Sequence, residues 1–195
     1  NVAMKSKSFA IGVRAEHRQD MIDEAMYGRK ERGPLGAAAY KLTAQLENGR
    51  GVYTFCMCPG GYVVNASSEQ GRLAVNGMSY HDRAGENANS AVIVTVTKDD
   101  YGSDHPLAGM EFQRRLEKKA WEEGGGNVPI QRFADFCTGT ISVKTGNVTP
   151  NIKGKYLAMC AIYFLRNLQN RLNRGFVRWG KRSKTSIMMT SYFPV

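Results

Sequence analysis

The sequence predicts an α+β fold, in which a small antiparallel β-barrel or sheet of about six strands precedes a helical subdomain. Two observations carry this prediction. Stretches with apolar side chains at every second position, or rich in β-branched residues, follow one another through the first 100 residues with short turns between them. Beyond Asp99 and Asp100 the apolar spacing becomes helical. We therefore expect a β part over residues 1–100 and a helical part over residues 101–195.

The β part opens with a strand at residues 8–16, where Phe9, Ile11 and Val13 recur at every second position. Residues 19–27 predict a short helix that Gly28 ends. The further strands that we expect cover residues 38–46, 51–57, 62–66, 72–76 and 91–97. The last of these, AVIVTVT, is a nearly continuous β-branched run, so we expect it to be buried on both faces.

The helical part starts with a helix over residues 106–123, which a run of three glycines ends. Its expected inner face carries Leu107, Met110, Leu116 and Ala120. The remaining expectations are a short helix at 129–136, a loop at 138–155, a long helix at 156–179 and a tail at 183–195 that either pairs as a last strand or stays loose.

Composition places the chain among globular proteins, because 195 residues with 42% apolar and 23% charged side chains can form a sizeable core. No run approaches the ~18 apolar residues of a membrane helix, so we expect no membrane partner. The four cysteines lack the spacing of a disulfide framework, which favours a reducing compartment, and we expect the cytoplasm. We expect Cys137 and Cys160 to pack in the core. The chain also opens without Met, as a fragment of a longer protein would.

The charge is concentrated at one end of the chain. The first 135 residues hold 17 basic and 17 acidic side chains, whereas the last 60 hold ten basic ones and no acidic one. This segment favours either a polyanionic partner or a solvated face that docks on another domain. The ten basic residues are Lys144, Lys153, Lys155, Arg166, Arg171, Arg174, Arg178, Lys181, Arg182 and Lys184.

The segment from residue 50 to residue 90 carries the residues that suit a ligand. Cys56 and Cys58 are two positions apart, so an extended strand would place both sulfurs on one face. Pro59 then removes a backbone donor, and Gly60 and Gly61 allow positive φ or a close approach to the backbone. A disulfide within C-x-C is strained, and the scattered histidines do not suggest zinc, so we expect no metal.

Four motifs occur in a fixed order: SFAIGVRAEH, YTFCMCPGGYVV, NGMSYHDR and ENANSAVIVTV. In these motifs the chain resembles the inserted, or cap, domain of the uncharacterised FAD-dependent dehydrogenases of bacteria. The resemblance covers residues 9–100 and continues more weakly through PLAGMEFQRRLE and PIQRFADF. It implies a flavoprotein parent whose insert covers the flavin and forms part of the pocket for a small-molecule substrate.

The resemblance also implies what the chain lacks. It contains no G-x-G-x-x-G fingerprint after a strand, so the FAD would be held by a Rossmann-type domain elsewhere in the parent. That missing domain is the partner that we expect. By itself the chain is expected to bind no FAD and to be catalytically inactive.

Roles for individual residues follow from the matching motif positions. Cys56 and Cys58 are the candidate catalytic residues, as a redox partner or proton donor beside the flavin, which would need a lowered thiol pKa. The candidate cofactor-binding residues are Pro59, Gly60, Gly61, Asn76, Gly77 and Met78. The candidate substrate-binding residues are Arg14, His17, Arg83, Asn87 and Asn89, of which the cations would bind an anionic substrate.

Two other function classes stay open at this point. The basic last third is compatible with a nucleic-acid-binding module, although its aromatic residues fit an inner helix face better than a stacking platform. Cys56 and Cys58 are compatible with a thiol redox or metal module. The flavoprotein cap domain is the interpretation that we favour.

Overall fold

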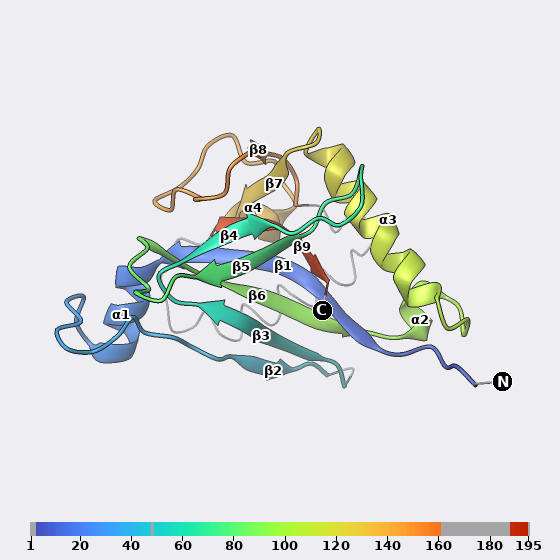
Figure 1. The fold of residues 1–195 in the computed structure, drawn as a ribbon, viewed down its shortest axis with the longest axis horizontal. Coiled ribbons are helices and arrows are strands. Elements are labelled where there is room, and N and C mark those ends of the chain that lie inside the picture. The colour runs from blue at the N-terminus through green and yellow to red at the C-terminus, as the bar shows by residue number, and fades with distance from the viewer. Residues whose placement is uncertain (1–2, 48, 161–187, 195) are drawn as a thin grey trace.

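The computed structural model describes residues 3–47, 49–160 and 188–194, the last seven by their backbone alone. Within this part of the chain, seven strands form an open sheet in the order β2-β3-β6-β1-β9-β7-β8, and β4 and β5 form a separate two-stranded sheet (Figure 1). The strands are β1 Phe9–Arg18, β2 Thr43–Gln45, β3 Gly51–Cys58, β4 Gly61–Asn65, β5 Val75–Ser79, β6 Asn87–Val96, β7 Val128–Arg132, β8 Lys155–Leu157 and β9 Met188–Pro194. The helices are α1 Gln19–Tyr27, α2 Lys98–Tyr101, α3 Ala108–Glu123 and α4 Phe133–Thr138.

The centre of the large sheet is the antiparallel pair β1 and β6, which match over ten residues from Phe9 opposite Val96 to Arg18 opposite Asn87. The β-branched run of β6 and the alternating residues of β1 give both strands side chains that pack well on a pleated surface. Both strands are buried along nearly their whole length. They therefore form the centre of the sheet, against which the other elements pack.

One face of this sheet carries the main apolar core. Val13 of β1 and Val92 of β6 lie directly opposite each other there, and the side chains of Phe112 and Leu116 from α3 pack against the same cluster with Phe136 from α4. Phe112 and Phe136 are fully buried. The helix α3 thus uses only part of its surface for packing: its charged side chains other than Glu117, which is buried, are partly or fully exposed.

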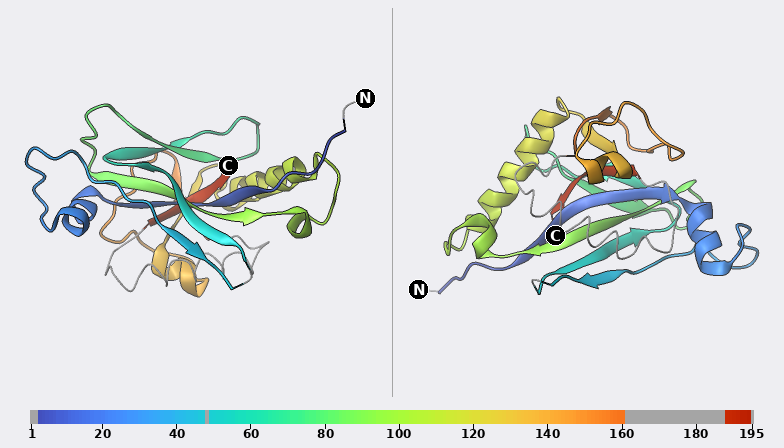
Figure 2. Two further views of the ribbon diagram at one scale, coloured as in Figure 1. Left: turned by 90° about the horizontal axis from the view of Figure 1, so that it is seen from below. Right: turned by 180° about the vertical axis from the view of Figure 1, so that it is seen from behind.

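The other face is covered by the β4–β5 hairpin. Figure 2 shows the hairpin and α4 on opposite sides of the sheet. Val63 of β4 and Val75 of β5 pack with Val128 and Ile130 of β7 and with Leu73 in a second apolar cluster. Between the hairpin and the sheet the chain also encloses a set of buried polar side chains, and these form the candidate site.

The α+β class is confirmed, but the barrel alternative is wrong, because the sheet is open with β2 and β8 at its edges. The strands at residues 8–16, 51–57 and 91–97, the hairpin and the helix at 19–27 are confirmed within a few residues. Of the strand expected at 38–46, only Thr43–Gln45 forms. After residue 101 the chain returns to the sheet with β7, β8 and β9.

Three expectations for the later part of the chain need correction. Residues 129–132 belong to a strand, and the helix α4 begins only at Phe133. Leu107 and Met110 are exposed, and Phe112 takes the buried position on α3. The long helix expected at 156–179 falls almost wholly outside the described residues, and where they overlap, β8 reaches Leu157. The tail, for which two outcomes were open, does pair as a last strand, β9.

Candidate functional site

A β-bulge in β3 creates the site. Phe55 pairs with Ala91 of β6, but the next matched pair is Cys58 with Asn89, so two residues of β3 lie opposite a single residue of β6. The extra residue is accommodated at Cys56, whose φ of 44° lies in the left-handed region. Strict alternation would have placed Cys56 and Cys58 on one face. The bulge instead moves Cys58 to the face that carries Phe55 and Asn89.

Arg14 lies at the centre of that face and has no exposed surface. Its Nε donates to Asn89 Oδ1 at 2.6 Å and its Nη1 to Asn76 Oδ1 at 3.4 Å. Its Nη2 donates to the Cys56 carbonyl oxygen at 2.5 Å and lies 3.4 Å from Cys58 Sγ. One guanidinium therefore holds the bulge of β3, the hairpin strand β5 and the central strand β6 together.

Gly77 of β5 is the residue that lets the hairpin close over Arg14. A Cβ atom at this position would lie 2.1 Å from Arg14 Nη2 and 2.2 Å from Asn89 Oδ1, far inside van der Waals contact. Only glycine permits this approach without displacing the guanidinium. Arg14, Cys58, Asn76, Gly77 and Asn89 thus form one packed unit, which we call the Arg14 cluster.

The cluster determines the state of the Cys58 thiol. Burial raises the pKa of Cys58, while the charge of Arg14, its hydrogen bond and that of Ser79 act in the opposite direction. Burial likewise lowers the pKa of Arg14, and the two cysteines oppose that shift. The lowered thiol pKa expected of a redox partner is therefore not found at Cys58, which favours a neutral thiol.

The turn after β3, residues 59–61, is buried and is fixed by contacts with Gln19 and Arg83. The Gly60 amide donates to Gln19 Oε1 at 2.7 Å, and its Cα lies so close to the Arg83 carbonyl that a Cβ would meet that oxygen at 1.8 Å. Gly60 has a φ of 50°. Pro59, Gly60 and Gly61 are all buried. The Gly60 amide is thus engaged by Gln19 and does not face outward.

A second group of polar side chains continues from the Arg14 cluster along β1 and β6. Glu16 has no exposed surface, and its Oε1 accepts hydrogen bonds from Asn87 Nδ2 at 2.9 Å and from the Asn151 amide at 3.1 Å. The Asn151 side chain bonds Val63 and Gly61 of β4. Burial raises the pKa of Glu16. Asn87 and Asn89 are therefore buried hydrogen-bond partners of Glu16 and Arg14, respectively.

The three cations proposed for an anionic substrate do not converge. His17 is three residues from Arg14 and so lies on the opposite face of β1, where its Nε2 is 2.6 Å from the Tyr40 hydroxyl. The Tyr40 hydroxyl continues to Ser90 Oγ at 2.9 Å. Arg83 lies exposed in a turn with a φ of 50°. Burial lowers the pKa of His17 to about 4 and raises that of Tyr40 to about 12.

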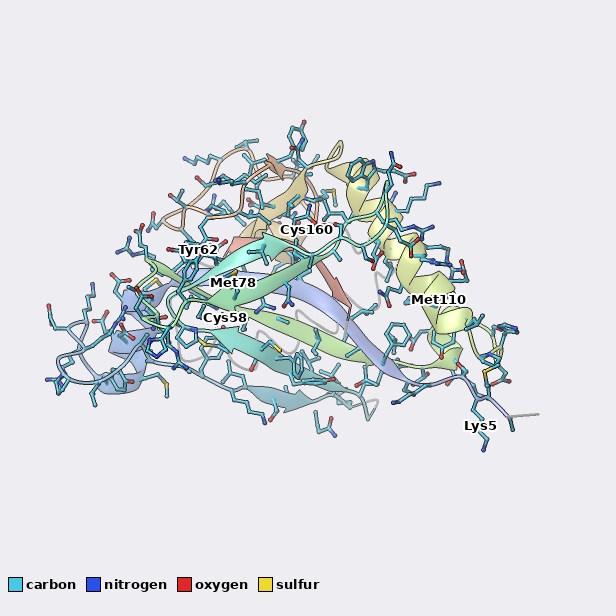
Figure 3. The ribbon with its side chains drawn as sticks, viewed as in Figure 1. Lys5, Cys58, Tyr62, Met78, Met110 and Cys160 are labelled. Atoms are coloured by element: carbon cyan, nitrogen blue, oxygen red, sulfur yellow. The ribbon has the colours of Figure 1, made fainter. Side chains whose placement is uncertain are left out.

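Part of the predicted site remains exposed beside the cluster. Phe55, Met78 and Tyr80 keep exposed fractions of 41%, 37% and 61%, and Cys56 is exposed as well. Tyr62 is opposite Met78 across the hairpin, and its ring meets that of Tyr80 edge to face with centroids 5.6 Å apart. Figure 3 shows Cys58, Met78 and Tyr62 from three strands in one part of the molecule. We refer to the exposed Phe55 and Cys56 of β3, together with the exposed Met78 and Tyr80 and the half-buried Tyr62 of the hairpin and its end, as the exposed apolar surface.

Some residues of the site were not found from the sequence. Three of them are hydrogen-bonded to predicted residues, yet none stands out by type or spacing: Gln19 bonds Gly60, Asn151 bonds Gly61 and Tyr40 bonds His17. Cys160 is buried, whereas Cys137 is only half-buried. Within the described ranges no three His, Cys, Asp or Glu side chains are grouped as metal ligands would be. No helix of those ranges has the length and apolar character needed to cross a bilayer.

Comparison with known proteins adds an independent result. A family model described as "FAD-dependent protein, C-terminal domain-like" matches residues 8–193. An uncharacterised protein from Clostridium beijerinckii is 52% identical to this chain over 160 residues. That match covers 80% of this chain but 30% of the relative's length. This chain therefore spans about a third of the relative that it matches.

Proposed function

This chain belongs to the family of FAD-dependent protein C-terminal domain-like sequences, and from that premise we propose that it is the cap or substrate domain of an FAD-dependent oxidoreductase. In this proposal it covers the flavin, forms part of the substrate pocket and is inactive alone. The observation that carries the proposal is the exposed apolar surface on β3 and on the β4–β5 hairpin, the two elements that close over the buried, pre-organised cation of the Arg14 cluster.

The exposed apolar surface fits the flat ring system of a flavin. Aromatic and thioether side chains favour contact with flat aromatic rings, and Phe55, Met78 and the Tyr62–Tyr80 pair offer both kinds. The described residues fit the nucleotide half of FAD less well. The first turn of α1 carries Asp20, which disfavours a pyrophosphate, and the sequence has no G-x-G-x-x-G fingerprint. We therefore assign the nucleotide half to the parent's other part.

A bound flavin supplies the hydride and electron transfer, and the residues of this chain supply positioning and charge. Arg14 is fixed by its hydrogen bonds to β3, β5 and β6 at a site where burial excludes water, so its positive charge is directed and weakly screened. Cys58 sits against this charge as a neutral thiol. Cys56 is the thiol that reaches the surface. In this arrangement Cys56 contacts the flavin or substrate, and Cys58 remains behind it.

The test uses the full-length protein that contains this chain. It should purify with bound FAD. Met78→Ala should weaken FAD binding by about tenfold, because burial of the thioether against the flavin ring contributes about 1.5 kcal/mol or more. Met110→Ala is the matched control, since Met110 is exposed to 39% but lies on α3, away from the hairpin (Figure 3). The measurement is the flavin absorbance retained after titration of apoprotein with FAD.

Two outcomes would contradict the proposal. A full-length protein that binds no FAD would exclude a flavin-covering role for this chain. If FAD binds but Met78→Ala behaves as Met110→Ala does, the hairpin does not face the flavin. A loss of affinity confined to Met78→Ala supports the cap role.

A further inference from the structure

Two buried polar atoms on the site's face have no hydrogen-bond partner within the described part of the chain. They are Glu16 Oε2 and Asn89 Nδ2. Glu16 and Asn89 are directly opposed across β1 and β6, so their side chains leave the sheet on the same face. Neither residue has any exposed surface. A carboxyl oxygen and an amide donor left in this way cost free energy unless something joins them.

The hydrogen bonds around Glu16 are those of a neutral acid. Both donors, Asn87 Nδ2 and the Asn151 amide, are directed at Oε1, and within the described residues Oε2 receives none. An ionised carboxylate shares its charge over two oxygens and accepts donors on both, whereas an acid has one accepting carbonyl and one hydroxyl that donates. Burial of the group raises its pKa, which agrees with the geometry.

The charged groups that face Glu16 do not provide an ion pair. Within the described residues, no Lys, Arg or His nitrogen lies within 4.0 Å of its carboxyl group. Lys155 of β8 acts on it from a distance and donates to the Pro150 carbonyl oxygen at 2.7 Å. Arg18, two residues along β1, bonds Asp20 and Glu86. Arg14 donates to β3, β5 and Asn89.

We propose that Glu16 is held as a neutral carboxylic acid and that one buried water joins its Oε2 hydroxyl to Asn89 Nδ2. The water accepts a hydrogen bond from each of the two groups, which satisfies both atoms with a single molecule. Such waters make about three hydrogen bonds to otherwise unsatisfied groups and belong to the structure. The ligand of this site is therefore water, enclosed between β1, β6 and the hairpin.

A neutral Glu16 has a consequence for the Arg14 cluster. A carboxylate on the next same-face position of β1 would attract the charge of Arg14 and weaken its effect on Cys58. The neutral acid leaves that charge directed at Cys58 Sγ and the Cys56 carbonyl. Any effect of this charge on a bound flavin rests on the proposed function. The protonation state of Glu16 and the buried water do not depend on it.

Infrared spectroscopy of the full-length protein tests the protonation state. At neutral pH the wild type should show the carbonyl band of a protonated carboxylic acid, and Glu16→Gln should remove it. Glu117→Gln is the matched control, because Glu117 is also a buried carboxyl, on α3, and accepts from Gln113 at 2.9 Å. The band should persist in this control. Its absence from the wild type, or its survival in Glu16→Gln, overturns the proposal.

The water is tested in two ways. Asn89→Leu removes Nδ2 and should shift the acid band, and a crystal structure of the wild type should show density for one water between the two atoms. Empty density there overturns the water site even where Asn89→Leu fails to fold. Absence of FAD from the full-length protein would contradict the proposed function and leave the infrared result unaffected, so the two failures are distinguishable.

Discussion

At the scale of single residues, the site depends on one close contact. Arg14 can be buried because neutral oxygens and a sulfur surround its guanidinium, and because Gly77 presents no side chain to it. Burial of a cation without such partners would cost several kcal/mol. The glycine of the Asn76–Gly77 motif is therefore a packing requirement and not only a turn signal.

Gly77→Ala should destabilise the protein by about 3 kcal/mol, since a methyl group 2.1 Å from Arg14 Nη2 forces the guanidinium or the hairpin to move. Denaturant unfolding measures the difference. Gly36→Ala serves as the control, because a Cβ at Gly36 meets nothing within 4 Å, and it should change the free energy of unfolding by about 0.5 kcal/mol or less. Equal effects of the two substitutions would contradict the packing role of Gly77.

At the scale of elements, α1 positions the turn at residues 59–61, which follows the two cysteines of β3. Gln19 is fully buried at the first position of α1 and joins three segments, because its side chain accepts from the Gly60 amide and donates to Asp23 and to the Ala38 carbonyl oxygen. Asp23 is paired in turn with Arg32. The helix therefore fixes the turn through polar contacts, while the bulge in β3 fixes the direction of Cys58.

Gln19→Ala should destabilise the protein by about 2–3 kcal/mol, because it leaves the buried Gly60 amide and Ala38 carbonyl without their partner. Hydrogen exchange should accelerate at the Gly60 amide more than in β1. Gln70→Ala, at an exposed position between β4 and β5, is the control and should have little effect. Unchanged exchange at Gly60 in Gln19→Ala would refute the positioning role of α1.

At the scale of the whole molecule, buried titratable groups couple folding to pH. His17 keeps a pKa of about 4 in the folded protein, against 6.5 for an unperturbed side chain. Between these values the unfolded chain binds the proton and the folded one does not, so stability falls as the pH is lowered through this window. Above pH 6.5 the contribution is complete, and below about pH 4 no further loss comes from His17. Glu16 acts with the opposite sign, because a raised pKa favours the folded state at lower pH.

The pH dependence of His17 is isolated by comparison with His17→Gln. The wild type should lose about 3 kcal/mol more than the variant between pH 6.5 and pH 4, as 2.5 pH units at about 1.36 kcal/mol each imply. The measurement is the free energy of unfolding across this pH range for both proteins. Parallel curves would show that His17 titrates in the folded protein as it does in the unfolded one.

The sequence by itself determined the α+β class, the central strands and the motif that carries the sulfurs. These features depend on side-chain periodicity and turn residues that act over a few positions, as the β-branched run of β6 illustrates. Through the resemblance of their motifs it also predicted Arg14, Cys58, Asn76, Gly77 and Asn89 among the candidate site residues, and in the structure these five pack together.

Only the tertiary structure decided how those residues are arranged. The bulge in β3 reverses the face of Cys58, and His17 lies on the face of β1 opposite Arg14. The sheet is open, and β7, β8 and β9 belong to it. A bulge is set by the pairing of two strands and not by local sequence, and a shift of one residue exchanges the two faces. The faces of a strand, and therefore the members of a site, follow from register, which is fixed by contacts distant in the chain.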